Sequence, residues 1–193
     1  MVILRSPSRA IPLVLALATA LVACGAGPTV TRSPAPAATP ATTPVPGLAP
    51  VGETETARVV RVVDGDTIII DRGRGNERLR YIGIDAPESV KPDTPVQFMG
   101  KEASAANEAL VGDRELVLER DVSETDRFGR LLRYAWLRDG DGWLFVNLEL
   151  VREGFAQVAT FPPDVRWADT FRAAQREARD ADLGLWGFAT PAP

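Results

Sequence analysis

The sequence predicts an α+β protein that is mainly β, built as a small closed barrel of five strands with three helices. Residues 57–188, about 130 of the chain's 193, have the composition of a globular domain and suffice for one hydrophobic core. Five short runs in this span are rich in Val, Ile and Leu and are separated by turn residues, which is typical of strands. Three other runs place apolar residues at helical spacing.

Each predicted strand is bounded by a turn signal. An Asp-Gly-Asp sequence at residues 64–66 separates the first two runs, and a second turn over residues 71–76 leads to the third. A polar loop over residues 121–129 separates the last two. The predicted strands span residues 57–63, 67–71, 77–84, 114–120 and 130–138.

The predicted helices are bounded by proline and glycine. Pro92 and Pro95 prevent one helix from running through residues 89–99, which we interpret as a loop. Gly112 and Gly154 end the first two helices. The predicted helices span residues 101–111, 147–153 and about 163–182.

Strands with helices interposed and appended in this order favour a closed barrel of the OB type. Trp136 and Trp186 are interpreted as residues of the core or as plugs of the barrel.

The N-terminus has the pattern of a secretory signal. Arg5 and Arg9 precede an apolar run over residues 11–21, which is too short to span a bilayer comfortably. The run ends in Leu-Val-Ala-Cys, which resembles a bacterial lipobox with Cys24 as the lipidated first residue of the mature chain. The alternative is an ordinary signal with a chance cysteine, and then the protein is secreted. Both interpretations place the protein outside the cytoplasm.

The segment after the signal is dominated by Pro, Ala, Thr and Gly. It lacks the apolar side chains that offset ordering entropy, so we expect a disordered tether. The expected organisation is a signal peptide over residues 1–23, the lipidated Cys24 with its tether to residue 56, a folded domain over 57–188 and a disordered tail over 189–193.

Composition excludes several chemistries. The chain has no His, which excludes Ser-His-Asp sites and His-ligated zinc, and its single Cys excludes an internal disulfide. The 22 basic residues are outnumbered by 26 acidic ones, for a net charge of -4, which argues against a strongly basic coat for nucleic acid. Acid, base or metal chemistry must therefore use carboxylates, Arg, Lys, hydroxyls and backbone groups.

Two acidic clusters are candidates for a cation site. Asp66, in the Asp-Gly-Asp turn, and Asp85, at the end of the third strand, supply the oxygen donors that calcium prefers. Strict strand alternation puts Arg80 and Asp85 on opposite faces, so they converge only if the chain bends, for example at Gly83. The alternatives are a plain hairpin turn and solvated loop acids such as Glu88, and these residues alone leave both open.

A third cluster contains two arginines around a glycine, in Thr125-Asp-Arg-Phe-Gly-Arg130. Two guanidinium groups and a cation suit a phosphodiester, whose transition state gains negative charge on its oxygens. A carboxylate can accept the proton of attacking water, so no His is needed.

Together the motifs resemble the staphylococcal nuclease family. The resemblance covers essentially all of residues 57–188 and none of the signal or tether. It rests on segments in the family's order and spacing: Val63-Asp-Gly-Asp-Thr67, Arg80, Ile84-Asp-Ala-Pro-Glu88, Thr125 to Arg130, Val146 to Ala156, and Leu185-Trp186.

The resemblance implies an OB-fold barrel with three helices and calcium-dependent hydrolysis of DNA and RNA. It also implies a monomer that favours single-stranded or denatured substrates. By position, Asp66 and Asp85 are the implied calcium carboxylates, and Ala86 offers its carbonyl. Glu88 is the implied carboxylate that positions or deprotonates water. The arginines implied to bind the scissile phosphate are Arg80 and Arg130.

The sequence also departs from the family. Ala86 replaces a common threonine, which keeps the carbonyl but removes a hydroxyl. In the region of residues 160–163, well-known members place tyrosines against the nucleotide, whereas this sequence has Thr-Phe-Pro-Pro and lacks those tyrosines. The competing interpretation is a catalytically silent OB module on the cell envelope that binds nucleic acid or another partner, and a third is an envelope scaffold. Finding all five charged site residues together favours the enzyme.

Overall fold

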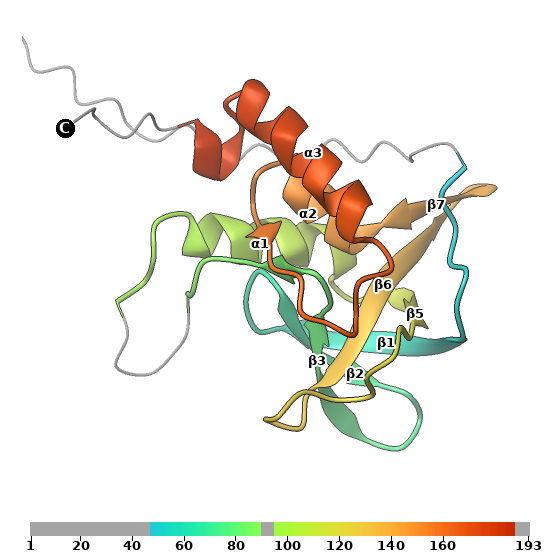
Figure 1. The fold of residues 1–193 in the computed structure, drawn as a ribbon. Helices are drawn as coiled ribbons and strands as arrows, with labels where there is room; N and C mark the ends of the chain where they lie inside the picture. Colours follow the sequence, from blue (N-terminus) through green and yellow to red (C-terminus); the bar gives the residue numbers. More distant parts are fainter. Residues whose placement is uncertain (1–46, 90–94, 188–193) are drawn as a thin grey trace, which may run out of the picture. The chain divides into compact units, whose positions relative to one another are not determined.

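The computed structural model describes residues 47–89 and 95–187 (Figure 1). The predicted signal peptide, Cys24, most of the tether and the whole predicted tail lie outside the described residues.

Five strands close into a barrel. β1 (Thr54–Val62) pairs with β2 (Thr67–Asp71) on one side and with β5 (Glu115–Glu119) on the other, and β3 (Asn76–Tyr81) follows β2. β6 (Leu131–Asp139) pairs antiparallel with β5 and parallel with β3, which closes the ring. The predicted mainly β, five-stranded OB barrel is therefore confirmed.

The three predicted helices are α1 (Gly100–Val111), α2 (Val146–Arg152) and α3 (Ala168–Asp180), followed by the 3-10 turn η1 (Gly184–Trp186). They gather at one end of the barrel (Figure 1). One side of α1 and of α3 is lined mainly by small and apolar residues that are buried, whereas α2 is buried nearly all round and packs against both β6 and α3. No helix in the described part of the chain is long and apolar enough to cross a membrane.

The barrel core is aromatic at the end next to α3. Trp136 on β6 is fully buried and stacks on Phe145 with ring centroids 3.9 Å apart. Its interpretation as a core residue is therefore confirmed. Phe171 of α3 packs on the same Phe145 ring at 5.4 Å. Trp186 is only half-buried, and the Arg179 guanidinium lies over its ring at 4.2 Å, so it caps the end of α3 and is not a core residue.

The strands differ from the prediction in three places. β1 begins three residues before the predicted residue 57, at Thr54, because Thr54 to Arg58 pair with β5. The third predicted strand breaks after Tyr81, and its end forms β4 (Ile84–Asp85), which pairs with β8 (Gln157–Val158). β7 (Gly142–Phe145) forms a hairpin with β6 and was not predicted.

The last helix begins at Ala168, five residues after the predicted Pro163. The reason is Asp164, which is 6% exposed and accepts hydrogen bonds from the N–H groups of Val122 and Ser123 at 3.0 and 2.8 Å. Because these bonds hold Asp164 against the loop that contains Val122 and Ser123, residues 161–167 form an ordered segment before the helix and not its first turn.

Candidate active site

The turn between β1 and β2 is held from several sides. The Asp64 N–H donates to the Thr67 carbonyl at 3.2 Å, so the segment is the hairpin turn that the sequence predicts. The buried Asn107 side chain on α1 donates to the Asp64 carbonyl at 2.9 Å. A side-chain carbon at Gly65 would lie 2.5 Å from Ala86 Cβ, so glycine is what lets Ala86 approach this turn.

Asp66 presents a buried carboxyl to Ala86. The residue is 2% exposed, and its Oδ1 accepts the Thr67 hydroxyl at 2.9 Å while its Oδ2 accepts the Ala86 N–H at 2.8 Å. Burial raises the pKa of Asp66 to about 7, and the nearby Arg80 acts in the opposite direction. The Asp-Gly-Asp sequence is thus a hairpin turn that also aims a carboxyl inward.

The break between β3 and β4 turns Asp85 back toward the barrel. Gly83 has φ +82°, and a Cβ at this position would collide with the Phe171 ring on α3. Beyond the break, Asp85 pairs with Gln157 of β8. The bend that Arg80 and Asp85 need in order to converge lies at Gly83.

One nitrogen of Arg80 bridges two carboxylates. Its Nη2 lies 3.1 Å from Asp66 Oδ2 and 2.7 Å from Asp85 Oδ1, and it donates to the Ile84 carbonyl at 3.2 Å. The Arg80 side chain is 20% exposed and that of Asp85 is 45% exposed. The guanidinium is therefore enclosed, while the Asp85 carboxylate opens to solvent.

Arg130 lies at the end of a tight loop that Asp126 organises. Asp126 Oδ1 accepts the N–H groups of Phe128 and Arg130 at 2.8 and 3.0 Å, and its Oδ2 accepts the Arg130 Nε at 2.6 Å. Partial burial alone would raise the pKa of Asp126, but these bonds from Arg130 and Phe128 lower it. The ionised carboxylate fixes the plane of the Arg130 guanidinium.

Arg80, Asp85 and Arg130 line one cavity of about 560 Å³, which we call the main cleft. Two exposed aromatic rings also line it, Phe128 at 69% and Phe161 at 73% exposure. The Arg127 guanidinium lies 4.7 Å from the Phe128 ring centroid and that of Arg130 lies 5.5 Å away. Sequence reasoning assigned no role to these phenylalanines, although an aromatic residue in a polar loop is a signal that could have found them.

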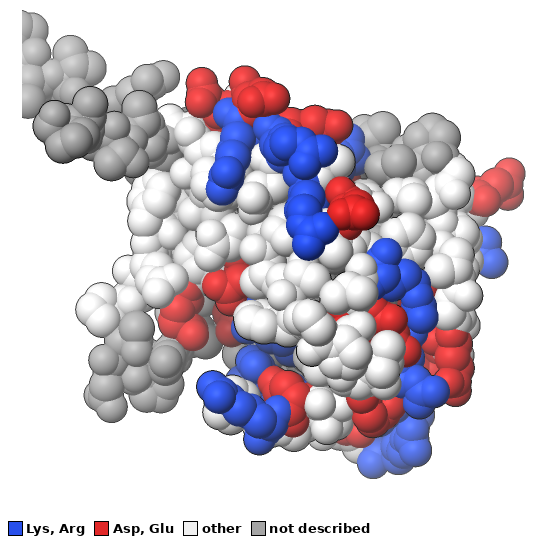
Figure 2. All heavy atoms as spheres, in the orientation of Figure 1, with Lys and Arg blue, Asp and Glu red and all other residues white. Residues whose placement is uncertain are grey.

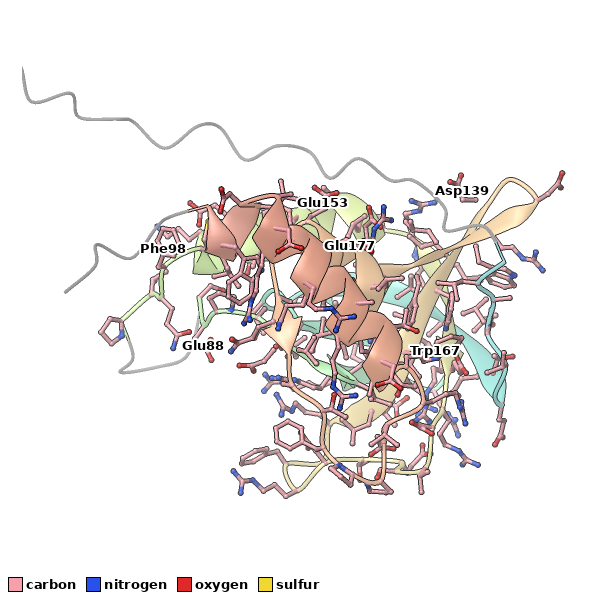
Figure 3. The ribbon with its side chains drawn as sticks, turned by 45° about the horizontal axis from the view of Figure 1, so that its top comes forward. Glu88, Phe98, Asp139, Glu153, Trp167 and Glu177 are labelled. Atoms are coloured by element: carbon pink, nitrogen blue, oxygen red, sulfur yellow. The ribbon has the colours of Figure 1, made fainter. Side chains whose placement is uncertain are left out.

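Glu88 is fixed through its backbone. Its N–H donates to Gln97 Oε1 at 2.9 Å, and its carbonyl accepts the Gln97 N–H at 2.9 Å. A Cβ at Gly100 would lie 2.6 Å from the same carbonyl, so α1 begins directly against this loop. Glu88 lies on the side of the molecule that carries Phe98, away from Asp139 in the β6–β7 hairpin (Figure 3).

The oxygen donors near the main cleft suit a hard cation. They are the carboxylates of Asp66 and Asp85 and, as the family resemblance implies, the backbone carbonyl of Ala86, a residue whose N–H donates to Asp66 at 2.8 Å. In residues 47–89 and 95–187, no three His, Cys, Asp or Glu side chains converge to hold a metal ion. Since calcium takes about six to eight oxygens, backbone carbonyls, water or substrate must complete the shell. The donor set fits an open site.

On the face of the molecule that Figure 2 shows, positive charge does not form one continuous patch. In the view of Figure 2, Lys and Arg form separate groups divided by acidic and uncharged residues. This pattern and the net charge of -4 favour binding of an anion by a few placed arginines.

The fold and the site together define a class: an OB-barrel protein whose cleft is lined by three arginines and three aspartates, namely Arg80, Arg127, Arg130, Asp85, Asp126 and Asp164. The family model described as "Staphylococcal nuclease homologue" matches residues 78–187. The chain is 40% identical over 140 residues to the thermonuclease of Staphylococcus hyicus, covering 72% of this chain and 80% of that protein. It is 42% identical over 132 residues to the thermonuclease of Staphylococcus intermedius, covering 68% and 76%.

A third relative is the endonuclease YncB of Bacillus subtilis, which is 38% identical over 135 residues, covering 67% of this chain and 62% of that protein. The chain belongs to the staphylococcal nuclease family. Arg80, Asp85, Glu88 and Arg130 all lie within the residues that the family model matches, while Asp66 lies before them.

Proposed function

We propose that this domain is a nuclease that hydrolyses phosphodiester bonds of DNA, RNA or both, with calcium as its metal. The observation that carries the proposal is the bridge from Arg80 to Asp66 and Asp85 at 3.1 and 2.7 Å, in a cleft that also holds Arg130. The relatives named thermonuclease and endonuclease support the same activity.

Two guanidinium groups act on the phosphate in this proposal. Asp126 engages the Nε and Nη2 of Arg130, both at 2.6 Å, so the remaining N–H groups of Arg130 are held in a defined orientation. Arg80 is fixed by its ion pairs with Asp66 and Asp85. Preorganised donors of this kind stabilise charge that develops on the phosphate oxygens, since they need little reorganisation during the reaction.

Glu88 supplies the carboxylate for water. The bonds of its backbone to Gln97 hold the loop, so its side chain is presented from a fixed position close to Asp85 in the chain. In this role the Glu88 carboxylate orients the attacking water and accepts its proton.

Calcium would be held by Asp66, Asp85 and the carbonyl of Ala86. When bound, it supplies a positive charge that polarises the phosphate and offsets the charge of the transition state. The methyl group of Ala86 leaves this donor set intact, because its contribution is a backbone oxygen.

The direct test is the release of acid-soluble nucleotides from single-stranded DNA by the full chain, first in calcium and then with excess chelator. We expect release in calcium and its loss with chelator. No release in calcium would favour the silent module or the scaffold, and unchanged release with chelator would overturn the role of the metal.

The location of the enzyme is part of the proposal and rests on the sequence before residue 47. Cys24 follows a signal-like segment, so we infer a lipid-anchored protein on the outer side of a bacterial membrane. Expression of the wild type and of Cys24→Ala in a bacterial host separates the alternatives. We expect the wild type in the membrane fraction and the variant in soluble fractions, whereas an identical distribution would contradict the anchor.

A further inference from the structure

A second cavity lies beside the first and shares one wall with it. Its volume is about 270 Å³, and its lining consists of Asp85, Pro87, Gln97, Phe98, Gln157 and Leu185. Asp85 also lines the main cleft, and among the described residues it is the one that the two linings share. A phosphate held by Arg80, whose guanidinium contacts Asp85 at 2.7 Å, would therefore lie between the two cavities.

The chemistry of the second cavity suits a nucleobase and not a phosphate. Its lining contains no Lys or Arg among the described residues, whereas the main cleft contains Arg80, Arg127 and Arg130. Phe98 contributes an aromatic ring that is 57% exposed, and Gln97 and Gln157 carry amide groups. Aromatic faces stack bases without regard to sequence, and amides both donate and accept hydrogen bonds.

The second cavity is tied to the site. Gln157 Nε2 lies 3.5 Å from Asp85 Oδ2, and Gln97 holds the backbone of Glu88. The Leu185 N–H donates to the Gly154 carbonyl at 2.9 Å, which fixes the backbone of this lining residue. Phe98 and Glu88 lie on the same side of the molecule in Figure 3. A ligand here would touch the loop that carries the reacting carboxylates.

We propose that the second cavity is a nucleoside subsite, in which Phe98 stacks the base across the scissile phosphate from the nucleoside that occupies the main cleft. This inference rests on the proposed nuclease function and adds how a polynucleotide crosses the site. One strand would place consecutive nucleosides in the two cavities, with Asp85 between them. Because a volume near 270 Å³ is below the usual range of whole-ligand pockets, it accommodates one nucleoside and not a longer segment.

The test uses three single-stranded oligonucleotides, each with one cleavable phosphodiester. One is intact, and the others lack the base on the 5′ or the 3′ side of that bond. kcat/KM is measured for the full-length wild type, Phe98→Ala and Phe161→Ala. For the wild type we expect loss of either base to lower kcat/KM by about 10-fold, the scale of one base-aromatic stack.

The proposal predicts that Phe98→Ala abolishes the effect of one missing base and leaves the effect of the other. Phe161→Ala, in the main cleft, should show the reverse pattern. If Phe98→Ala slows all three oligonucleotides by the same factor, Phe98 is structural and the proposal is overturned. If the wild type cleaves none of them, the nuclease function itself fails, which is a separate result.

Two further variants distinguish the loss of base stacking from misfolding. Phe98→Tyr keeps the ring and should retain the wild-type dependence on both bases, so its loss would contradict stacking. Val51→Ala truncates a side chain that is 70% exposed and lines neither cavity, and it should behave as wild type on all three oligonucleotides.

Discussion

At the scale of single residues, Gly65 sets the distance between the two loops of the site. A Cβ there would lie 2.5 Å from Ala86 Cβ and 2.8 Å from Ala103 Cβ. Ala86 in turn donates its N–H to Asp66 at 2.8 Å. A glycine is thus required at position 65 so that Ala86 and Ala103 can approach the turn. The preference of hairpin turns for Asp-Gly is a second reason for glycine at this position.

Gly65→Ala should therefore push Ala86 away from Asp66. We expect a loss of about 1 to 3 kcal/mol in the free energy of unfolding, the usual cost of overpacking, together with a marked loss of nuclease activity. Urea unfolding and the DNA cleavage assay check the two effects.

Gly73→Ala is the matched control. Gly73 has φ +85° and open space around its Cβ position, so the variant tests backbone strain away from the site. It should lose stability but keep activity per folded molecule. Equal loss of activity in both variants would refute the specific role of the Gly65 contact.

Single residues also show how far sequence reasoning reached. Arg80 and Asp85 could be predicted to converge only if the chain bends, and Gly83 was a visible candidate for the bend. The exposed rings of Phe128 and Phe161 were not assigned, because lining a cleft depends on how distant loops meet. Asp126 was read as part of a motif, but its role in fixing Arg130 is visible only in the structure.

At the scale of elements, most strands and helices with local signals could be predicted, although β7 was missed despite its local hairpin with β6, and features that depend on distant partners could not be predicted. Apolar runs and turns located the five barrel strands. β8 contains two residues, Gln157 and Val158, and exists because β4 pairs with it. The start of α3 is set by Asp164, whose partners Val122 and Ser123 lie some forty residues earlier.

Helix α2 buries an ionisable group, Glu149, which is 1% exposed. Its Oε2 lies 3.0 Å from Arg152 Nη1, while its Oε1 is buried and has no hydrogen-bond partner among the described residues. Burial raises the pKa of Glu149 to about 7 from its ordinary 4.5, against the attraction of Arg152, and the charge of Glu153 adds to the rise. The ionised carboxylate is therefore less favourable in the folded chain than in the unfolded chain.

This predicts a pH dependence of stability. As the pH rises from about 4.5 to about 7, the unfolded chain loses the Glu149 proton first, so the folded state is progressively destabilised. The free energy of unfolding of Glu149→Gln, minus that of the wild type, should increase by about 1 to 3 kcal/mol over this range.

Urea unfolding at several pH values measures this difference. Glu177→Gln replaces an exposed glutamate on α3 and is the control for the substitution itself. A difference between Glu149→Gln and wild type that stays constant with pH would show that Glu149 does not titrate in this range.

At the scale of the whole molecule, an acidic protein must attract a polyanion through a few placed charges. With a net charge of -4 and positive groups that are separated in Figure 2, long-range attraction to nucleic acid is weak. We therefore expect binding to depend less on salt than in a basic protein, because few phosphates are neutralised. Affinity must come from the arginines and cation of the main cleft and from stacking beside it.

The most direct test of the account compares initial rates of single-stranded DNA hydrolysis in calcium for the wild type, Arg130→Ala and Glu88→Ala. Arg138→Ala is the matched control, since Arg138 stacks on Trp143 at 4.0 Å and lines no part of the main cleft. We expect each site variant to lose at least ~10²-fold in rate, a few kcal/mol of transition-state stabilisation, and Arg138→Ala to match wild type. Site variants as active as the wild type would contradict the proposed mechanism.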